Sequence, residues 1–227
     1  MSELGVSPDV ALGNLVARIR ACRHCAGAAA SGRPLAHEPR PVLRTSASAR
    51  LLIAGQAPGT RVQASGIPFS DPSGERLRAW MGVDDETFYD DTRVAILPMG
   101  FCFPGLDAKG GDLPPRRECA PLWRDEVLGH LAHLGLVLMV GGYAQRWHLG
   151  RLDPLLARRP LTEIVARWRE VMALCDQPRL VPLPHPSWRN NAWIRRNPWF
   201  EAELLPALRR EVAAALAGTL KRPPRHR

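Results

Sequence analysis

The chain has 227 residues, of which 45% are hydrophobic and 23% charged, an ordinary mixture for one globular domain with its own core. No apolar run reaches the roughly 18–20 residues that span a bilayer, and the first residues lack the pattern of a secretory signal, so a soluble intracellular protein is expected. The formal net charge of +9 favours polyanionic partners, because each phosphate that is neutralised releases a counterion. A generally basic, solvated surface is the alternative.

Strands and helices are predicted to alternate along the chain. The predicted strands are the apolar runs 50–54, 93–97, 135–140 and 179–183. The predicted helices are 8–21, 73–81, 118–134, 143–149, 161–174 and 198–217, and the expected loops are 26–48 and 103–116. This alternation predicts an α/β fold with a central, mostly parallel four-stranded sheet between helical layers. We expect a single domain over 1–227, with a core over about 12–217 and a flexible tail over 218–227.

Unusual residues follow three of the predicted strands. Gln56 comes after the first strand, Met99 after the second and His185 after the fourth. Ligands of open parallel sheets bind beyond the carboxyl ends of the strands. We therefore expect these three residues to lie around one site.

Two glycine- and proline-rich motifs follow the first strand, GQAPG at 55–59 and GIPFSDPSG at 66–74. Glycine lets a backbone approach a ligand closely, and proline fixes the turn, so such loops suit a flat ring or a phosphate. Phe69 is placed to stack on a base. The alternative is an ordinary turn with Phe69 in the core.

A third motif, PHPSWRNN at 184–191, follows the fourth strand. Prolines on both sides aim His185 rigidly, while Ser187 and the amides of Asn190 and Asn191 can contact phosphates. Trp188 and Arg189 are candidates for entering a duplex groove. The alternative is a histidine bonded to a backbone carbonyl, a turn serine and a packed tryptophan.

The cysteines form the fourth pattern. Cys22 and Cys25 make a CxxC pair, and Cys102 and Cys119 flank a loop rich in proline and glycine. Four thiolates suit either an iron-sulfur cluster or zinc. The fifth, Cys175, is expected to be an unpaired core thiol.

The order of these motifs resembles the uracil-DNA glycosylase superfamily, and within it the iron-sulfur branch, often called family four. That branch has a GEAPG-type first motif, a PF-containing segment, an N-terminal CxxC, two cysteines around a proline-rich loop, and a late HPS. The segment 137–150 also resembles the branch's third strand and following helix. The similarity covers about residues 12–210 and implies a three-layer α/β/α fold.

The resemblance implies a monomeric DNA glycosylase of base excision repair. Such an enzyme flips a deaminated base, uracil first of all, out of single- or double-stranded DNA and hydrolyses its N-glycosidic bond. The cofactor implied is a structural 4Fe-4S cluster, with zinc as the alternative, and the location is the cytoplasm, at the nucleoid in a bacterium. The implied residues are His185, Gln56 and Asp71 for catalysis; Ala57, Phe69 and Met99 for the base; Ser187, Trp188, Arg189 and Asn190 for DNA; and Cys22, Cys25, Cys102 and Cys119 for the metal.

Three positions depart from the branch's pattern. Gln56 stands where an acidic residue is usual, Pro98 stands where an asparagine reads the uracil edge, and Asp71 replaces a glycine. Asp71 could supply the missing carboxylate, or it could cap the helix predicted over 73–81.

Three other functions stay open. A non-catalytic nucleic-acid-binding protein of the same fold agrees with the changes at Gln56 and Pro98. A glycosylase for hypoxanthine or xanthine agrees with the changed base-reading position. A zinc-stabilised hydrolase of small molecules would lack the GxSxG nucleophile motif.

Overall fold

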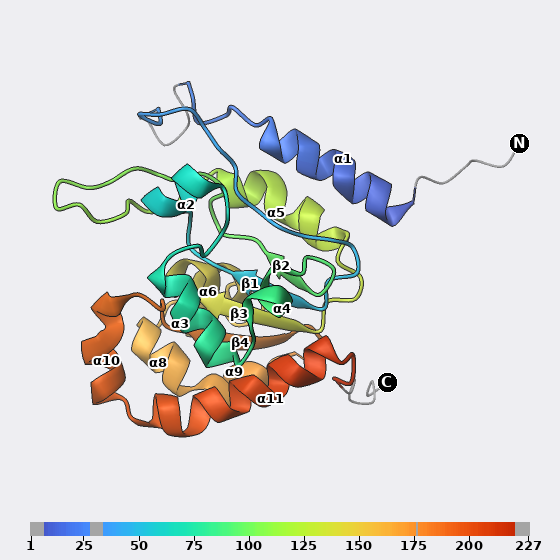
Figure 1. The fold of residues 1–227 in the computed structure, drawn as a ribbon. Coiled ribbons are helices and arrows are strands. Elements are labelled where there is room, and N and C mark those ends of the chain that lie inside the picture. Colours follow the sequence, from blue (N-terminus) through green and yellow to red (C-terminus); the bar gives the residue numbers. More distant parts are fainter. Residues whose placement is uncertain (1–6, 28–33, 176, 221–227) are drawn as a thin grey trace, which may run out of the picture.

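The chain folds around one parallel sheet in the order β2-β1-β3-β4 (Figure 1). The computed structural model describes residues 7–27, 34–175 and 177–220. The strands are β1 (Leu51–Ala54), β2 (Val94–Ile96), β3 (Leu136–Val140) and β4 (Arg179–Leu183). All three strand pairs are parallel, so the predicted fold class is confirmed.

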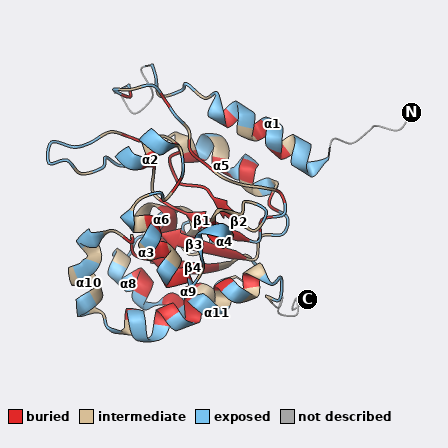
Figure 2. Ribbon diagram, in the orientation of Figure 1, coloured by how far each residue is buried: buried red, intermediate tan, exposed pale blue. Residues whose placement is uncertain are grey.

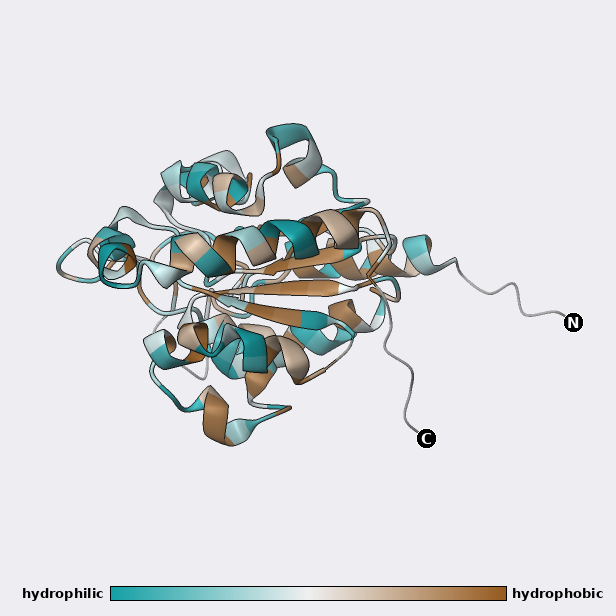
Figure 3. Cartoon of the chain, turned by 90° about the horizontal axis from the view of Figure 1, so that it is seen from below, coloured by the Kyte–Doolittle hydropathy of each residue, from teal (hydrophilic) through white to brown (hydrophobic). Residues whose placement is uncertain are grey.

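Both faces of the sheet are covered, which explains why its strands are apolar without alternation. The helices on one face are α1 (Pro8–Arg20), α5 (Cys119–Gly129), α6 (Gly142–Leu149) and α7 (Pro154–Ala157). On the other face lie α3 (Pro72–Met81), α4 (Asp85–Tyr89), the π-turn η2 (Phe200–Leu204) and α11 (Leu205–Leu216). Figure 2 shows the strands as the most continuously buried part of the chain, and in Figure 3 they run as apolar ribbons between the helical layers.

The helix predicted over 161–174 is two helices, α8 (Leu161–Ala166) and α9 (Trp168–Ala173). Arg167, at φ −91° and ψ 23°, leaves the helical region between them. The break serves both cores, because Val165 and Trp168 pack on the α3 side of the sheet while Ile164 and Val171 pack on the α1 side.

Other predicted boundaries were wrong in smaller ways. The helix predicted over 118–134 ends at Gly129, and the helix predicted over 198–217 begins as the π-turn η2. The prediction missed α2 (Thr60–Ser65), α4, α7, the 3₁₀ turn η1 (Trp188–Asn190) and α10 (Asn191–Arg196). These elements are too short for an apolar period to reveal them. Most of the predicted tail, 221–227, lies outside the described residues, and no described helix is long and apolar enough to cross a membrane.

Candidate functional site

A cavity of about 790 Å³ opens beyond the carboxyl ends of the strands, and we call it the strand-end cavity. Most of its wall comes from the loop after β1 with the start of α2, the segment 68–76 around the start of α3, the loop 105–113 and the loop after β4. Val42, Ile96 and Pro98 complete the lining. The residues that carry its chemistry are Gln56, Ala57, Arg61, Phe69, Asp71, Arg76, Asp112, His185, Ser187, Trp188, Arg189 and Asn190.

Phe69 lines this cavity in an unusual backbone conformation. Its φ is 55°, a left-handed value that costs a non-glycine residue free energy. The Tyr89 hydroxyl donates to the Phe69 carbonyl at 3.1 Å, and Arg78 Nη1 donates to it at 3.4 Å. The half-buried ring is also close to Gly55, where an added Cβ would lie 3.3 Å from it. The phenyl ring is therefore held at the cavity wall rather than wholly in the core.

His185 is held by its own loop and by α3. The side-chain amide of Asn190 donates to the His185 carbonyl at 2.6 Å. Arg76 Nη1 donates to the Ser187 carbonyl at 3.1 Å and to Asn191 Oδ1 at 2.7 Å. Burial lowers the pKa of His185, and the nearby Asp71 carboxylate opposes that shift. The imidazole is accordingly neutral near pH 7 and can donate one hydrogen bond into the cavity.

Asp71 is the N-cap of α3, as the capping alternative predicted. Its Oδ1 accepts a hydrogen bond from the Gly74 amide at 3.0 Å. The residue also lines the strand-end cavity. One of its oxygens is thus committed to the helix.

The DNA-binding candidates lie at the cavity, with different surroundings. Trp188 is 70% exposed, and the Arg189 guanidinium lies 5.3 Å from the centre of its ring. Asn190 instead supports the backbone of His185, because its side-chain amide donates to the His185 carbonyl. Arg195 and Arg196, two further arginines that follow the PHPSWRNN motif, are exposed on α10 and do not line the cavity.

Met99 does not lie at the strand-end cavity, where the sequence analysis predicted it. It is 5% exposed and belongs to the core between the sheet, α5 and α6. Its amide donates to the Gly55 carbonyl at 2.9 Å, which continues the pairing beyond β2, and it does not line the cavity. Pro98 lines it instead.

Three charged residues of the cavity escaped the sequence analysis. Arg61 and Arg76 lie on α2 and α3, and Asp112 lies in the loop 105–113. Arg61 follows the GQAPG motif closely, so its position was a usable signal. Nothing local to the sequence marks Asp112, because only the folded loop brings it to the cavity.

The four candidate metal ligands line a second cavity, which we call the cysteine cavity. Cys22 and Cys25 follow α1, Cys102 follows the extension of β2, and Cys119 begins α5. Ile19, Pro39, Pro41, Phe101, Leu122 and Trp123 supply apolar walls. As placed, the described residues contain no group of three or more His, Cys, Asp or Glu side chains that could hold a metal ion.

The donor chemistry of the cysteine cavity nevertheless fits a thiolate-bound cluster. Burial raises the pKa of Cys102 and of Cys119 to about 12, so a metal cation is needed to favour their thiolates. The Phe101 amide donates to Cys119 Sγ at 3.3 Å, the type of hydrogen bond that tunes sulfur ligands. A cluster also spreads its four ligands over several iron atoms, so it does not require three side chains around one ion.

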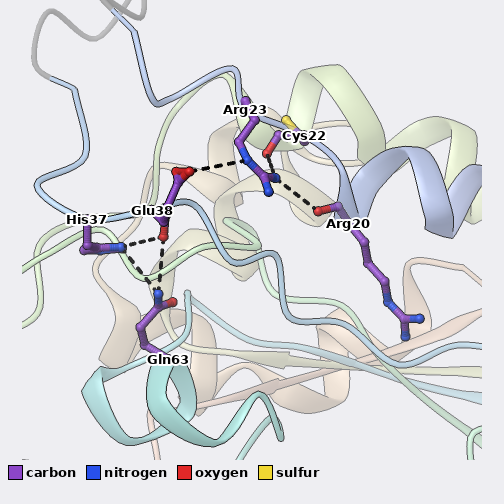
Figure 4. Close-up of polar contacts among 6 residues, drawn as sticks. All are labelled: Arg20, Cys22, Arg23, His37, Glu38 and Gln63. Atoms are coloured by element: carbon purple, nitrogen blue, oxygen red, sulfur yellow. Dashed lines mark hydrogen bonds and ion pairs between the residues drawn. The ribbon is translucent and has the colours of Figure 1, made fainter.

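Figure 4 shows how the turn after α1 is tied to its neighbours. Arg23 Nη1 donates to the Cys22 carbonyl at 3.1 Å, and its Nε lies 4.0 Å from the Glu38 carboxylate. The Gln63 amide, on α2, donates to the Glu38 carbonyl at 3.4 Å. His37 joins this group and stacks on Phe103, with 5.4 Å between ring centroids. The cysteine turn is thereby linked through residues 37–38 to α2.

The profile of the Uracil DNA glycosylase superfamily matches residues 43–209. The match contains all four strands and every lining residue of the strand-end cavity except Val42. The chain therefore belongs to the uracil DNA glycosylase superfamily. Cys22 and Cys25 precede the matched region, so the match does not distinguish among branches of the superfamily.

Proposed function

We propose that this protein is a DNA glycosylase that removes a deaminated base, uracil first of all. The observation that carries the proposal is the combination of Phe69 and a neutral His185 in one cavity with an exposed tryptophan among its lining residues. Superfamily membership supports the same chemistry. A base leaving the duplex needs a pocket that stacks it and binds its edge, and this cavity offers both.

In this proposal each group acts on a different part of the nucleotide. Phe69 stacks on the flipped base, and backbone amides of Gln56 and Ala57 contact it. As the glycosidic bond breaks, negative charge develops on the base, and the neutral His185 stabilises it by donating a hydrogen bond. The rigid loop around His185 keeps that donor fixed, so little reorganisation is needed during the reaction.

The remaining residues handle the strand. Trp188, exposed beside Arg189, is suited to fill the space that the base leaves. Ser187, Arg61 and Arg76 line the same cavity and suit phosphates.

The wall at Pro98 favours a second candidate substrate class. Proline has no side-chain donor, and its carbonyl already accepts a hydrogen bond from Arg124 Nη1 at 3.3 Å. Nothing at that position can read the edge of a pyrimidine as an amide would. A larger deaminated purine, hypoxanthine or xanthine, is therefore the alternative base.

We further propose that Cys22, Cys25, Cys102 and Cys119 hold a structural 4Fe-4S cluster. Its chemistry would be ligation alone, tying the turn after α1 to both ends of the segment 102–119. Zinc is the alternative occupant.

The test is product analysis on labelled single-stranded and duplex oligonucleotides that contain one deoxyuridine, deoxyinosine or deoxyxanthosine. We expect release of at least one base. His185→Ala should lower the single-turnover rate about 100-fold or more with little effect on DNA affinity. His133→Ala, an exposed histidine before β3, is the matched control and should behave as wild type. Release of no base would identify a non-catalytic binding protein.

A further inference from the structure

Two carboxylates line the strand-end cavity, Asp71 and Asp112. Hydrolysis of a glycosidic bond builds positive charge on the sugar and consumes a water molecule, and carboxylates serve both needs. Asp71 already gives one oxygen to the Gly74 amide. The side chain of Asp112 has no hydrogen bond or ion pair with any described residue. Both carboxylate oxygens of Asp112 are therefore free to accept a proton, whereas Asp71 has one such oxygen.

The loop 105–113 is a small hairpin that fixes the position of Asp112. Leu106 and Asp112 form an antiparallel bridge, and the Leu113 amide donates to the Gly105 carbonyl at 2.9 Å. Asp107 closes the tip by accepting hydrogen bonds from the backbone amides of Lys109 and Gly111, at 2.8 and 2.9 Å. In Figure 1 this hairpin projects beside α2.

Asp112 reaches the loop after β1 at a glycine. An added Cβ at Gly59 would lie 3.4 Å from Asp112 Oδ2. Gly59 is three residues beyond Gln56 in the same cavity wall. Gln56 has no charge, so it supplies no carboxylate to this wall. The carboxylate of Asp112, from another part of the chain, lies beside the same wall.

We propose that Asp112 is the carboxylate that activates the attacking water, an assignment that rests on the proposed glycosylase function. As the bond between C1′ and the base nitrogen breaks, its electron pair leaves with the base, to which His185 donates. The water oxygen bonds to C1′, and its proton passes to Asp112. The protonated Asp112 then returns that proton to the released base or to solvent.

The surroundings of Asp112 favour proton uptake by its carboxylate. The residue is exposed overall, and the partial burial of its carboxylate raises its pKa; the Arg189 guanidinium opposes this shift, and the Asp71 and Asp107 carboxylates add to it. His185, Arg61 and Arg76 are the other charged or titratable groups of the cavity wall. A carboxylate with a raised pKa accepts a proton from water more readily than an ordinary aspartate.

The experiment compares Asp112→Asn, Asp71→Asn and the surface control Asp9→Asn on whichever labelled oligonucleotide the wild type cleaves. We expect Asp112→Asn to slow base release about 100-fold or more. Its DNA affinity should be unchanged or tighter, because a negative charge has gone. The wild-type rate should rise with pH through an apparent pKa above that of an ordinary aspartate, and this rise should vanish in Asp112→Asn. Asp9→Asn should match wild type.

The outcomes separate the two proposals. A wild type that releases no base overturns the glycosylase function and the role of Asp112 with it. If the wild type releases a base and Asp112→Asn releases it at the same rate, only the role of Asp112 is overturned. A slow variant that keeps the pH-dependent rise also overturns it. Melting curves check folding, and Asp112→Ser, which is smaller and also uncharged, should be as slow if Asp112→Asn is poorly folded.

Discussion

Arg124 on α5 is 1% exposed, yet no carboxylate among the described residues forms an ion pair with it. Its Nη1 donates to the carbonyls of Leu97 and Pro98, at 2.9 and 3.3 Å, and its Nη2 lies 3.0 Å from His148 Nε2. A guanidinium can only donate, so that nitrogen of His148 must accept and the ring must be neutral. Burial, then the charges of Arg124 and Arg151, hold the pKa of His148 well below its ordinary value of 6.5.

This buried neutral histidine predicts a loss of stability in acid. Below pH 6.5 His148 binds a proton in the unfolded chain but not in the native chain, where its pKa is lower. Unfolding is therefore favoured as the pH falls. The contribution is fully present above pH 6.5 and declines below it, by up to about 1.4 kcal/mol per pH unit. His185, whose pKa is also lowered by burial, adds a loss of the same sign.

The measurement is the free energy of urea unfolding between about pH 5 and 8, roughly the range in which histidine titrates. His148→Gln keeps an acceptor for Arg124 and should reduce the slope below pH 6.5 by close to one proton. His133→Gln, on the surface, should leave the slope unchanged. An unchanged slope in His148→Gln would mean that His148 is protonated in the native state.

Single residues were predicted well where the local sequence restricts them. Prolines beside His185 and glycines around Phe69 mark rigid loops at strand ends, and both side chains do line the strand-end cavity. The prediction that Met99 lies at the site was wrong, because the direction of a side chain after a short strand depends on backbone pairing, here with Gly55. Asp112 could not be predicted, since its place depends on the folding of a hairpin across the molecule.

At the scale of elements, the junction between the Phe69 loop and α3 depends on a glycine. A Cβ at Gly74 would overlap the Phe69 carbonyl oxygen. The helix start therefore requires glycine for space, while Tyr89 and Arg78 donate hydrogen bonds to the same carbonyl and hold Phe69 in its left-handed conformation.

Gly74→Ala should destabilise the protein by about 1–3 kcal/mol, as overpacking does, and should slow base release by moving Phe69. Gly13→Ala is the matched control, because Gly13 also lies in a helix but an added Cβ there meets nothing within 4 Å. It should stabilise by about 0.5–1 kcal/mol, since alanine is the better helix former. Thermal melts of both variants measure these changes in stability. Equal changes in Gly74→Ala and Gly13→Ala would contradict the steric role of Gly74.

The cysteine cavity joins three elements, and its occupant can be tested directly. We expect the purified chain to be brown and to contain iron and acid-labile sulfide, with both lost in Cys102→Ser. Cys175→Ser is the control, because Cys175 lies outside the cavity and its thiol donates to the Pro178 carbonyl at 3.0 Å. A colourless protein with one zinc would keep the site and replace the cluster, and a metal-free wild type would exclude both.

The strands were the most predictable elements, each within a residue or so of its predicted range. Buried runs bounded by glycine and proline leave few alternatives. The break at Arg167 could not be predicted, because an amphipathic pattern continues across it. Each of the two halves contributes one buried residue to each core, Ile164 and Val165 from α8 and Val171 and Trp168 from α9.

At the scale of the whole molecule, charge should control binding to DNA. The formal net charge is +9, and arginines 61, 76 and 189 line the strand-end cavity. Contacts with phosphates make the logarithm of the binding constant fall linearly with the logarithm of the salt concentration.

Arg61→Ala should lower the magnitude of that slope by about 0.7–0.9, the value of one phosphate contact. Arg61 is exposed, and its side chain forms no hydrogen bond or ion pair with another described residue, so its loss should not disturb the fold. Arg210→Ala, on the exposed side of α11, removes the same charge elsewhere and should leave the slope unchanged. Fluorescence anisotropy over a salt series measures the slope for both variants and the wild type. A slope for Arg61→Ala equal to that of the wild type would mean that Arg61 contacts no phosphate.

The position of β4 at one edge of the sheet has a consequence for the protein during its synthesis. The β2-β1-β3 part of the sheet, with Gln56, Phe69 and Asp112, leaves the ribosome before β4 and the loop that carries His185. Domains fold as their sequence emerges, so a nascent chain can form three strands and most of the cavity wall while still lacking His185. Under the proposed function, the newborn chain would gain the capacity to release a base only after β4 and the loop with His185 are added.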